Sequence, residues 1–235
     1  MIHLFYALIA SLASIAGGVL PLYTRIKDIK THYLVGFAAG VLISTALFEM
    51  LPQALAEMEP SDVGVPLALG FFSLYVIEKV AMIHACRETE CDIHHAGWAG
   101  ILGLGLESLL DGMAITAGYF SNPVLGFYIA IAVIVHELPV GFSTSIIMRS
   151  AGYNIQKSTI ALLITSFLTV VGALLAQNFP ATVFGPLLVF TAGSFLYIGA
   201  GDLLPEAHRS LSWSVVATVI AGASLIPIIG LFIGL

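Results

Sequence analysis

The feature that most constrains the fold is a series of eight apolar runs, each long enough to cross a lipid bilayer. A transmembrane helix needs about 20 apolar residues, and the runs cover residues 2–24, 33–55, 63–83, 97–120, 124–149, 156–178, 182–207 and 213–235. Only 9% of the 235 residues are charged, against about a quarter in soluble domains. The sequence therefore predicts one domain, an all-α integral membrane protein whose surroundings are lipid and not nucleic acid.

The distribution of lysine and arginine predicts the orientation of these spans. All eight basic residues fall in or beside the odd-numbered connectors, at Arg25, Lys27, Lys30, Lys79, Arg87, Arg149, Lys157 and Arg209. The second connector carries only acids, Glu57, Glu59 and Asp62. Because basic residues concentrate on the cytoplasmic side, we expect a multi-pass protein of the cell (inner) membrane with both termini outside.

A segment of the second span recurs in the seventh. Residues 39–54 (AGVLISTALFEMLPQA) align without gaps on residues 192–207 (AGSFLYIGAGDLLPEA), with Glu49 opposite Asp202. The two helices run in opposite directions, and inverted repeats around a polar site are typical of secondary transporters. We therefore expect spans 1–3 and 6–8 to form an inverted repeat around central spans 4 and 5. Chance similarity between two apolar helices is the alternative.

Ionisable residues lie at the predicted middle of the bilayer in spans 4 and 5. Glu107 and Asp111 are four residues apart, on one helix face, and His136 and Glu137 interrupt the apolar stretch YIAIAVIVHELPVGFSTSIIM. Each ionised side chain there costs on the order of 3 kcal/mol, and every basic residue is predicted at the cytoplasmic boundary. The compensating charge must therefore come from protons or from a bound cation.

These residues, with Ser108 beside Glu107, form a mixed oxygen and nitrogen ligand set. Such a set suits Zn²⁺, Fe²⁺, Mn²⁺ or Co²⁺ and disfavours Cu(I), which seeks thiolates. Pro139 is predicted to loosen the helix near His136, since proline cannot donate a backbone hydrogen bond. Hydrogen bonding between helices, without a metal, is the alternative interpretation of the same residues.

Further polar residues mark a predicted route through the membrane and a cytoplasmic loop. Four residues of spans 2 and 7 form a ladder from outside to inside: Glu49, Asp202, Glu206 and His208. For Glu206 and His208, a simple position at the headgroups is an equal alternative. The third connector, residues 84–96, concentrates five potential metal ligands, namely His84, Cys86, Cys91, His94 and His95. Their spacing matches no closed zinc site, so metal contact and a solvated loop both stay open.

The motifs ESLLDGMAI (107–115) and HELPVGFSTSI (136–146) resemble the ZIP family of divalent-metal transporters, and the resemblance covers the whole chain. The family typically has H-N-x-x-D-G in helix 4 and H-E-x-P-(E/H)-G in helix 5. The resemblance implies that Glu107, Asp111 and His136 bind the transported metal, Zn²⁺ foremost, and that Ser108 and Glu137 line an adjacent second position. It also implies that the metal is taken up into the cytoplasm and that the protein has no resident cofactor. Spans 1, 4, 5 and 6 are expected to move against the others during transport. A homodimer is a further expectation.

The sequence departs from the family pattern in two ways. Glu107 replaces the usual histidine, which makes the site harder and more acidic and is expected to favour Mn²⁺ or Fe²⁺ over Zn²⁺. Val140 stands where the family has a bridging Glu or His, and span 6 has no acid. We therefore expect one main metal site, with Glu137 and Ser108 either as weaker neighbouring ligands or as residues around the site that accept protons.

The alternative function is an intramembrane metal-dependent hydrolase, in which Glu107, Asp111 and His136 hold zinc and Glu137 acts as the base. The segment HELPV lacks the second histidine of H-E-x-x-H. The inverted repeat would also give a hydrolase no advantage. A transporter that is not an enzyme is therefore the favoured prediction.

Overall fold

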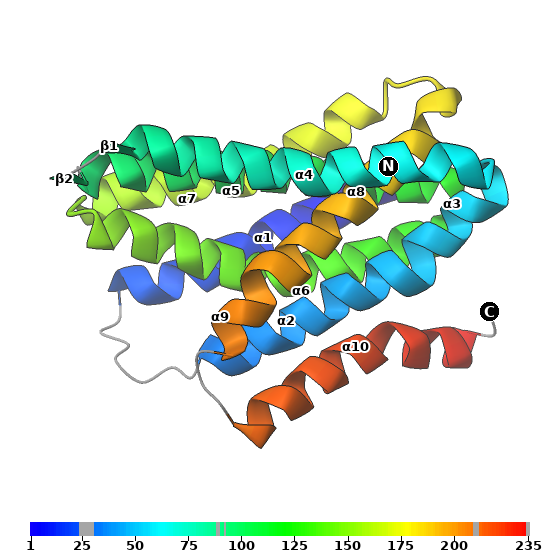
Figure 1. The fold of residues 1–235 in the computed structure, drawn as a ribbon. Coiled ribbons are helices and arrows are strands. Elements are labelled where there is room, and N and C mark those ends of the chain that lie inside the picture. Colours follow the sequence, from blue (N-terminus) through cyan, green and yellow to red (C-terminus); the bar gives the residue numbers. More distant parts are fainter. Residues whose placement is uncertain (24–30, 88–89, 92, 209–211, 234–235) are drawn as a thin grey trace.

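The computed structural model describes residues 1–23, 31–87, 90–91, 93–208 and 212–233, and the side chains of residues 81–100 are not among those described. Over these ranges the chain forms eight long helical segments (Figure 1). Six of the segments are single α-helices, of which α4 is followed by a short hairpin, and two segments contain π-helical turns. In chain order the elements are α1 (Ile2–Tyr23), α2 (Thr31–Thr45), η1 (Ala46–Met50), α3 (Leu51–Glu57), α4 (Pro60–Ala85), β1 (Cys86–Arg87), β2 (Glu90–Cys91), α5 (Ile93–Ser121), α6 (Pro123–Ser150), α7 (Ile155–Ala176), η2 (Ala181–Val183), α8 (Phe184–Leu196), η3 (Tyr197–Leu203), α9 (Leu204–His208) and α10 (Trp213–Ile233).

The predicted all-α architecture of eight spans is confirmed, since all eight segments are long and apolar enough to cross a membrane. One local difference lies in the third connector. Its backbone forms a two-stranded antiparallel hairpin in which Cys86 pairs with Cys91 and Arg87 with Glu90. Because α5 already begins at Ile93, the connector is shorter than the predicted 84–96.

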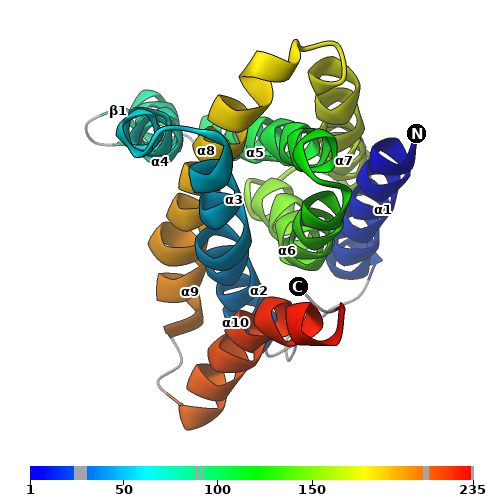
Figure 2. The same ribbon diagram turned by 90° about the vertical axis from the view of Figure 1, so that its right-hand side faces the viewer.

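The helices form two groups, which Figure 2 shows side by side in a view along the bundle. One group contains α1, α5, α6 and α7, and the other contains α2, α4, α8, α9 and α10. The closest helix approaches lie inside these groups and occur at glycines. A Cβ added to Gly112 of α5 would lie 1.8 Å from the carbonyl oxygen of Thr169 in α7, and one added to Gly70 of α4 would lie 1.8 Å from that of Phe190 in α8. Glycine therefore sets the spacing of helices within each group.

The first group has a second contact of this kind, between α1 and α6. A Cβ on Gly141 would lie 1.8 Å from the carbonyl oxygen of Ser14, and one on Gly17 would lie 2.1 Å from that of Leu138. In the second group, a Cβ added to Gly40 of α2 would lie 2.1 Å from the carbonyl oxygen of Val219 in α10. Every described glycine whose added Cβ would meet an atom of another helix at less than 3.4 Å meets one of its own group. The two groups are thus each closely packed internally.

Spans 2 and 7 both contain a π-helical segment, which the sequence analysis did not predict. Each changes from α-helix to π-helix just before its proline: η1 precedes Pro52, and η3 precedes Pro205. A proline lacks the N–H that an α-helix needs and its ring crowds the preceding turn, and a π-helical turn relieves that crowding at sites that are often functional. Glu49 lies in η1 and Asp202 in η3, so the aligned acids share a local geometry. The inverted repeat itself stays a prediction.

Pro139 behaves differently from these two prolines. The predicted loosening does not interrupt α6, which continues as one α-helix from Pro123 to Ser150. The reason is that α6 is enclosed by α1, α5 and α7, and neighbouring helices make proline tolerable in a transmembrane helix.

The glycine contacts predict a measurable asymmetry in stability along α5. Gly112→Ala should lower the thermal stability of the purified protein, because the added methyl meets the backbone of α7; overpacking of this kind costs about 1–3 kcal/mol. Gly103→Ala is the matched control, since nothing lies within 4 Å of its added Cβ. It should leave stability unchanged or raise it by up to about 1 kcal/mol. Equal melting temperatures for the two variants would contradict the packing described here.

Candidate metal site

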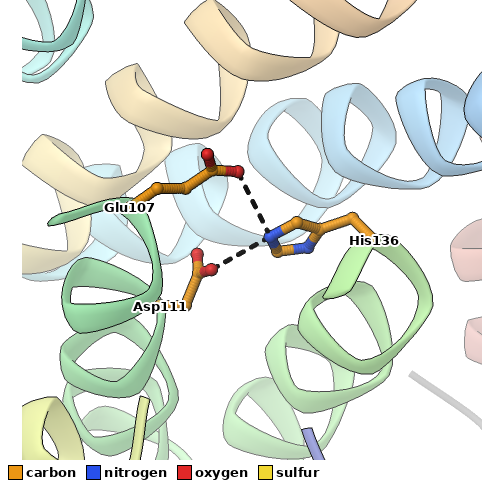
Figure 3. Close-up of side chains that lie close together, drawn as sticks. All are labelled: Glu107, Asp111 and His136. Carbon is orange, nitrogen blue, oxygen red and sulfur yellow. Dashed lines mark hydrogen bonds and ion pairs between the residues drawn. The ribbon is translucent and has the colours of Figure 1, made fainter. Parts of the chain in front are cut away.

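Three predicted ligands converge between α5 and α6 (Figure 3). His136 Nε2 lies 3.0 Å from Asp111 Oδ2 and 3.8 Å from Glu107 Oε1. One ligand atom from each residue lies within 4.8 Å of the other two. The helical spacing accounts for this arrangement: Glu107 and Asp111 are one turn apart on α5, and α6 packs against that face. Two carboxylates and one imidazole can thus reach a single cation.

The hydrogen bond on the far side of the imidazole fixes its tautomer. His136 Nδ1 lies 3.0 Å from the carbonyl oxygen of Ala132, one turn earlier in α6. A carbonyl oxygen can only accept, so Nδ1 carries the proton and donates. Nε2 is therefore the nitrogen that faces the two carboxylates and can take either a proton or a metal.

The site is buried, and the described basic side chains lie elsewhere. His136 and Asp111 are 0% and 1% exposed, and Glu107 is 9% exposed. Lys79 lies in the last two turns of α4, Arg149 next to the end of α6 and Lys157 in the first turn of α7. Glu107 Oε1 is buried and accepts no hydrogen bond from the described residues. The arrangement therefore concentrates negative charge at a place where a cation can neutralise it.

A cavity of about 470 Å³ leads away from the site on one side. It is lined by Glu107 and by residues of α5, α6, η3 and α9, among them Ser143, Asp202 and Glu206. The lining residues of α5 and α6 lie toward the start of α5 and the end of α6, the end of the bundle near the hairpin. The structure thus brings the predicted pathway residues Asp202 and Glu206 to the same cavity as the main ligand Glu107.

Packed apolar side chains close the other side of the site. Ile115 follows Asp111 by one turn in α5, and Val133 and Ile129 precede His136 in α6; all three are completely buried. Phe195 of α8 is 1% exposed, and its ring meets that of His136 edge-on with the centroids 5.8 Å apart. These four belong to the largest buried apolar cluster, together with Leu42 and Met50. Among the described residues, buried apolar side chains thus cover the site on the side away from the cavity.

Glu137 and Ser108 do not join the three convergent ligands. Ser108 Oγ donates to Glu137 Oε1 at 3.1 Å, and Thr169 Oγ1 of α7 donates to the same oxygen at 3.2 Å. Both residues are completely buried. The role of Thr169 was not predicted, because a hydroxyl in an apolar helix gives no sequence signal until the rotation of that helix is known.

Two of the predicted pathway residues, Glu49 and His208, lie apart from the cavity. Glu49 is half-buried in η1, and His208 is exposed in α9; neither lines the cavity. Of the four predicted pathway residues, Asp202 and Glu206 line the cavity beside Glu107, and Glu49 and His208 do not. The side chains of the third connector, His84, Cys86, Cys91, His94 and His95, lie outside the described ones, so their role stays a prediction.

Comparisons with known proteins identify the family to which this chain is similar. Residues 84–234 match the family model described as ZIP Zinc transporter. Zinc transporter foi of Drosophila melanogaster is 30% identical over 159 residues, which cover 65% of this chain and 22% of that protein. Zinc transporter YKE4 of Saccharomyces cerevisiae is 23% identical over 211 residues, 75% of this chain and 61% of that protein. Zinc transporter ZIP13 of Pongo abelii is 23% identical over 195 residues, 74% and 57% of the two chains.

The chain thus spans less than two thirds of the length of these curated relatives. The family match, by contrast, covers well over half of the chain and includes both helices of the buried site. With its eight apolar helical spans, this chain belongs to the ZIP zinc transporter family.

Proposed function

We propose that this protein moves divalent metal ions, Zn²⁺ foremost, across the membrane and that it is not an enzyme. The observation that carries the proposal is the convergence of Glu107, Asp111 and His136 within a bundle of membrane-length helices, beside a cavity that Glu107 lines. The relatives reported above are named as zinc transporters. A mid-membrane site that opens to one end and is sealed toward the other is what a carrier requires at one stage of its cycle.

The charge of the ligand set matches a dication. Two ionised carboxylates and a neutral imidazole carry two negative charges, which one divalent ion neutralises. In the metal-free site, one proton is shared between His136 Nε2 and Asp111 Oδ2, which lie 3.0 Å apart. A metal that binds between Glu107, Asp111 and His136 displaces this proton, since imidazole ligates only through its lone pair. Metal binding therefore releases protons, and acid should weaken it.

The cavity indicates the direction in which the ion leaves. The end toward which it extends carries the hairpin and the connectors that hold the basic residues, so the positive-inside rule assigns it to the cytoplasm. We accordingly propose an orientation with both termini outside and a structure open to the cytoplasm. Asp202 and Glu206, on the cavity wall opposite α5 and α6, would receive an ion released from Glu107.

The two helix groups supply a physical basis for alternating access. The ligands lie on α5 and α6 of one group, while Phe195, Asp202 and Glu206 belong to the other. Close glycine contacts hold each group together, so the cheapest motion is sliding of one group against the other. Such sliding of α1, α5, α6 and α7 would carry the site past Phe195 toward the outside.

The hydrolase alternative receives no support from the same residues. Its predicted base, Glu137, accepts hydrogen bonds from Ser108 and Thr169 through Oε1 and is completely buried. A general base must lie within reach of a water or substrate proton, and Glu137 does not line the cavity. The host membrane and a homodimeric state remain proposals from the sequence.

Loss of one ligand carboxylate should abolish uptake without unfolding the protein. In proteoliposomes, Asp111→Asn should reduce ⁶⁵Zn²⁺ uptake at least tenfold, because it removes a charge and a ligand from the buried site; tenfold corresponds to about 1.4 kcal/mol. Asp62→Asn is the matched control, since Asp62 is exposed in the first turn of α4. Uptake by Asp111→Asn equal to that of the control would contradict the proposal.

The carboxylate at position 107 should set the preference between metals. A carboxylate is harder than the imidazole that the family pattern has there, so Glu107→His should favour Zn²⁺ over Mn²⁺. In a competition assay, the Mn²⁺ concentration that halves ⁶⁵Zn²⁺ uptake should rise about tenfold relative to the unmodified protein. Glu59→His, at an exposed residue between α3 and α4, should leave that concentration unchanged. An unchanged value for Glu107→His would show that position 107 does not select the metal.

A further inference from the structure

The cavity beside the main site is larger than a single metal ion requires. Its volume of about 470 Å³ lies within the range of about 300–1,000 Å³ that is typical of small-molecule sites. Such sites have mostly apolar walls and a few polar groups that fix the orientation of the ligand. The apolar residues of this wall are Leu104, Pro139, Val140, Ile198, Leu203 and Pro205. The cavity therefore has the lining of a site for an organic molecule.

The ionisable groups of the cavity are all carboxylates. They belong to Glu107, Asp202 and Glu206, and no described basic residue lines the cavity. Glu107 is only 9% exposed, and its Oε1 accepts no hydrogen bond from the described residues. A cleft that combines one sign of charge with apolar walls concentrates ligands of the opposite sign. The lining thus selects a molecule that carries positive charge on an apolar body.

The carboxylates lie at two levels of the cavity. Glu107 is buried, whereas Asp202 and Glu206 are exposed and follow each other by four residues along η3 and α9. The exposed pair therefore marks the mouth of the cavity, and Glu107 marks its inner end. The two levels are near each other, since the charge of Asp202 acts on Glu107. A short molecule with a positive group at each end can reach both levels.

The two levels also belong to the two helix groups. Glu107 lies on α5, which packs with α1, α6 and α7, and the exposed pair lies on η3 and α9 of the other group. The proposed transport motion is a shift between these groups. A ligand that contacts Glu107 and the exposed pair at the same time would hold the two groups in their present relation.

We propose that this cavity binds an aliphatic diamine, with one ammonium group at Glu107 and the other at Asp202 and Glu206. The methylene groups between the two ammonium groups lie along the apolar wall, where their removal from water favours binding. Each ammonium group donates charge-assisted hydrogen bonds to carboxylate oxygens. A monoamine has only one such group and leaves the other level without a counter-charge. A metal ion has no apolar part that could use the wall.

Diamine binding has a consequence for transport, and this consequence rests on the proposed function. The diamine and the transported metal share Glu107, so they compete for it. The diamine also ties α5 to α9, and a ligand that prefers one state shifts the population toward that state. A diamine at the open end of the cavity would therefore inhibit metal uptake.

Calorimetric titration of the purified protein, freed first of metal with EDTA and then of the EDTA, tests the binding. Diaminobutane, with an ammonium group at each end of its chain, should bind saturably at about one molecule per chain. Butylamine should bind at least tenfold more weakly, and Asp202→Asn should weaken diaminobutane binding at least tenfold, because hydrogen bonds between charged groups are the strong ones. Glu206→Gln provides a second variant of the mouth if Asp202→Asn does not fold. Asp62→Asn is the matched control: this exposed carboxylate lies in the first turn of α4, and its loss should leave the affinity unchanged.

Uptake into proteoliposomes tests the consequence for transport. Diaminobutane on both sides of the membrane should lower ⁶⁵Zn²⁺ uptake by the unmodified protein and by Asp62→Asn. Butylamine at the same concentration should leave uptake unchanged. Saturable binding of diaminobutane without inhibition of uptake would overturn the claim that the ligand bridges the two helix groups.

Each other outcome also decides the matter. Absence of saturable diaminobutane binding would overturn the inference, and so would equal affinity for butylamine or binding that neither Asp202→Asn nor Glu206→Gln weakens. Asp111→Asn separates the two proposals, since Asp111 belongs to the three convergent ligands but does not line the cavity. It should abolish zinc uptake and leave diaminobutane binding intact. If the unmodified protein binds diaminobutane but transports no zinc, the proposed function fails and the diamine site remains.

Discussion

The arrangement depends on negative charge held inside an apolar bundle. Glu107, Asp111 and Glu137 lie on α5 and α6 within two helical turns, while the described basic residues lie toward helix ends or in the hairpin. Each such charge costs on the order of 3 kcal/mol in the middle of a bilayer, more than an ordinary hydrogen bond restores. The hydrogen bonds of Asp111 and Glu137 reduce this cost but do not remove the charge. A mobile cation is the natural counter-charge, and the cavity beside Glu107 gives it a route.

Close packing at glycines holds the helices that carry this charge in one of the two helix groups, and the proposed motion is a shift between these groups. Gly112 brings α5 into backbone contact with α7, and Gly141 and Gly17 bring α6 into backbone contact with α1. The two helices that carry the ligands are therefore packed into one unit with α1 and α7. The wall that carries Phe195 and Asp202 belongs to the other body. A shift between the two would change what the bound ion faces, from acids and water to an aromatic ring, without disturbing the ligands themselves. Packing, electrostatics and transport are thus properties of the same few helices.

Much of this could be predicted from the sequence, for reasons that differ between residues. The eight spans follow from the lengths of the apolar runs, and the pairing of Glu107 with Asp111 follows from the helical repeat. The family resemblance placed His136 opposite them. The contact of Thr169 with Glu137 could not be found in this way, because it depends on which helices become neighbours and how each is rotated. The π-helical turns before Pro52 and Pro205 were also not predicted. At Pro139, by contrast, α6 continues as one α-helix, because its neighbouring helices enclose it. Glu49, aligned with Asp202 in the sequence, does not share its cavity.

The most direct test of the central claim is anomalous scattering from crystals soaked in Cd²⁺ or Mn²⁺. A peak should appear among Glu107 Oε1, Asp111 Oδ2 and His136 Nε2, and it should be missing from crystals of Asp111→Asn. No peak there at saturating metal, with the protein intact and the three side chains in place, would contradict the claim that these buried anions exist to bind a divalent cation.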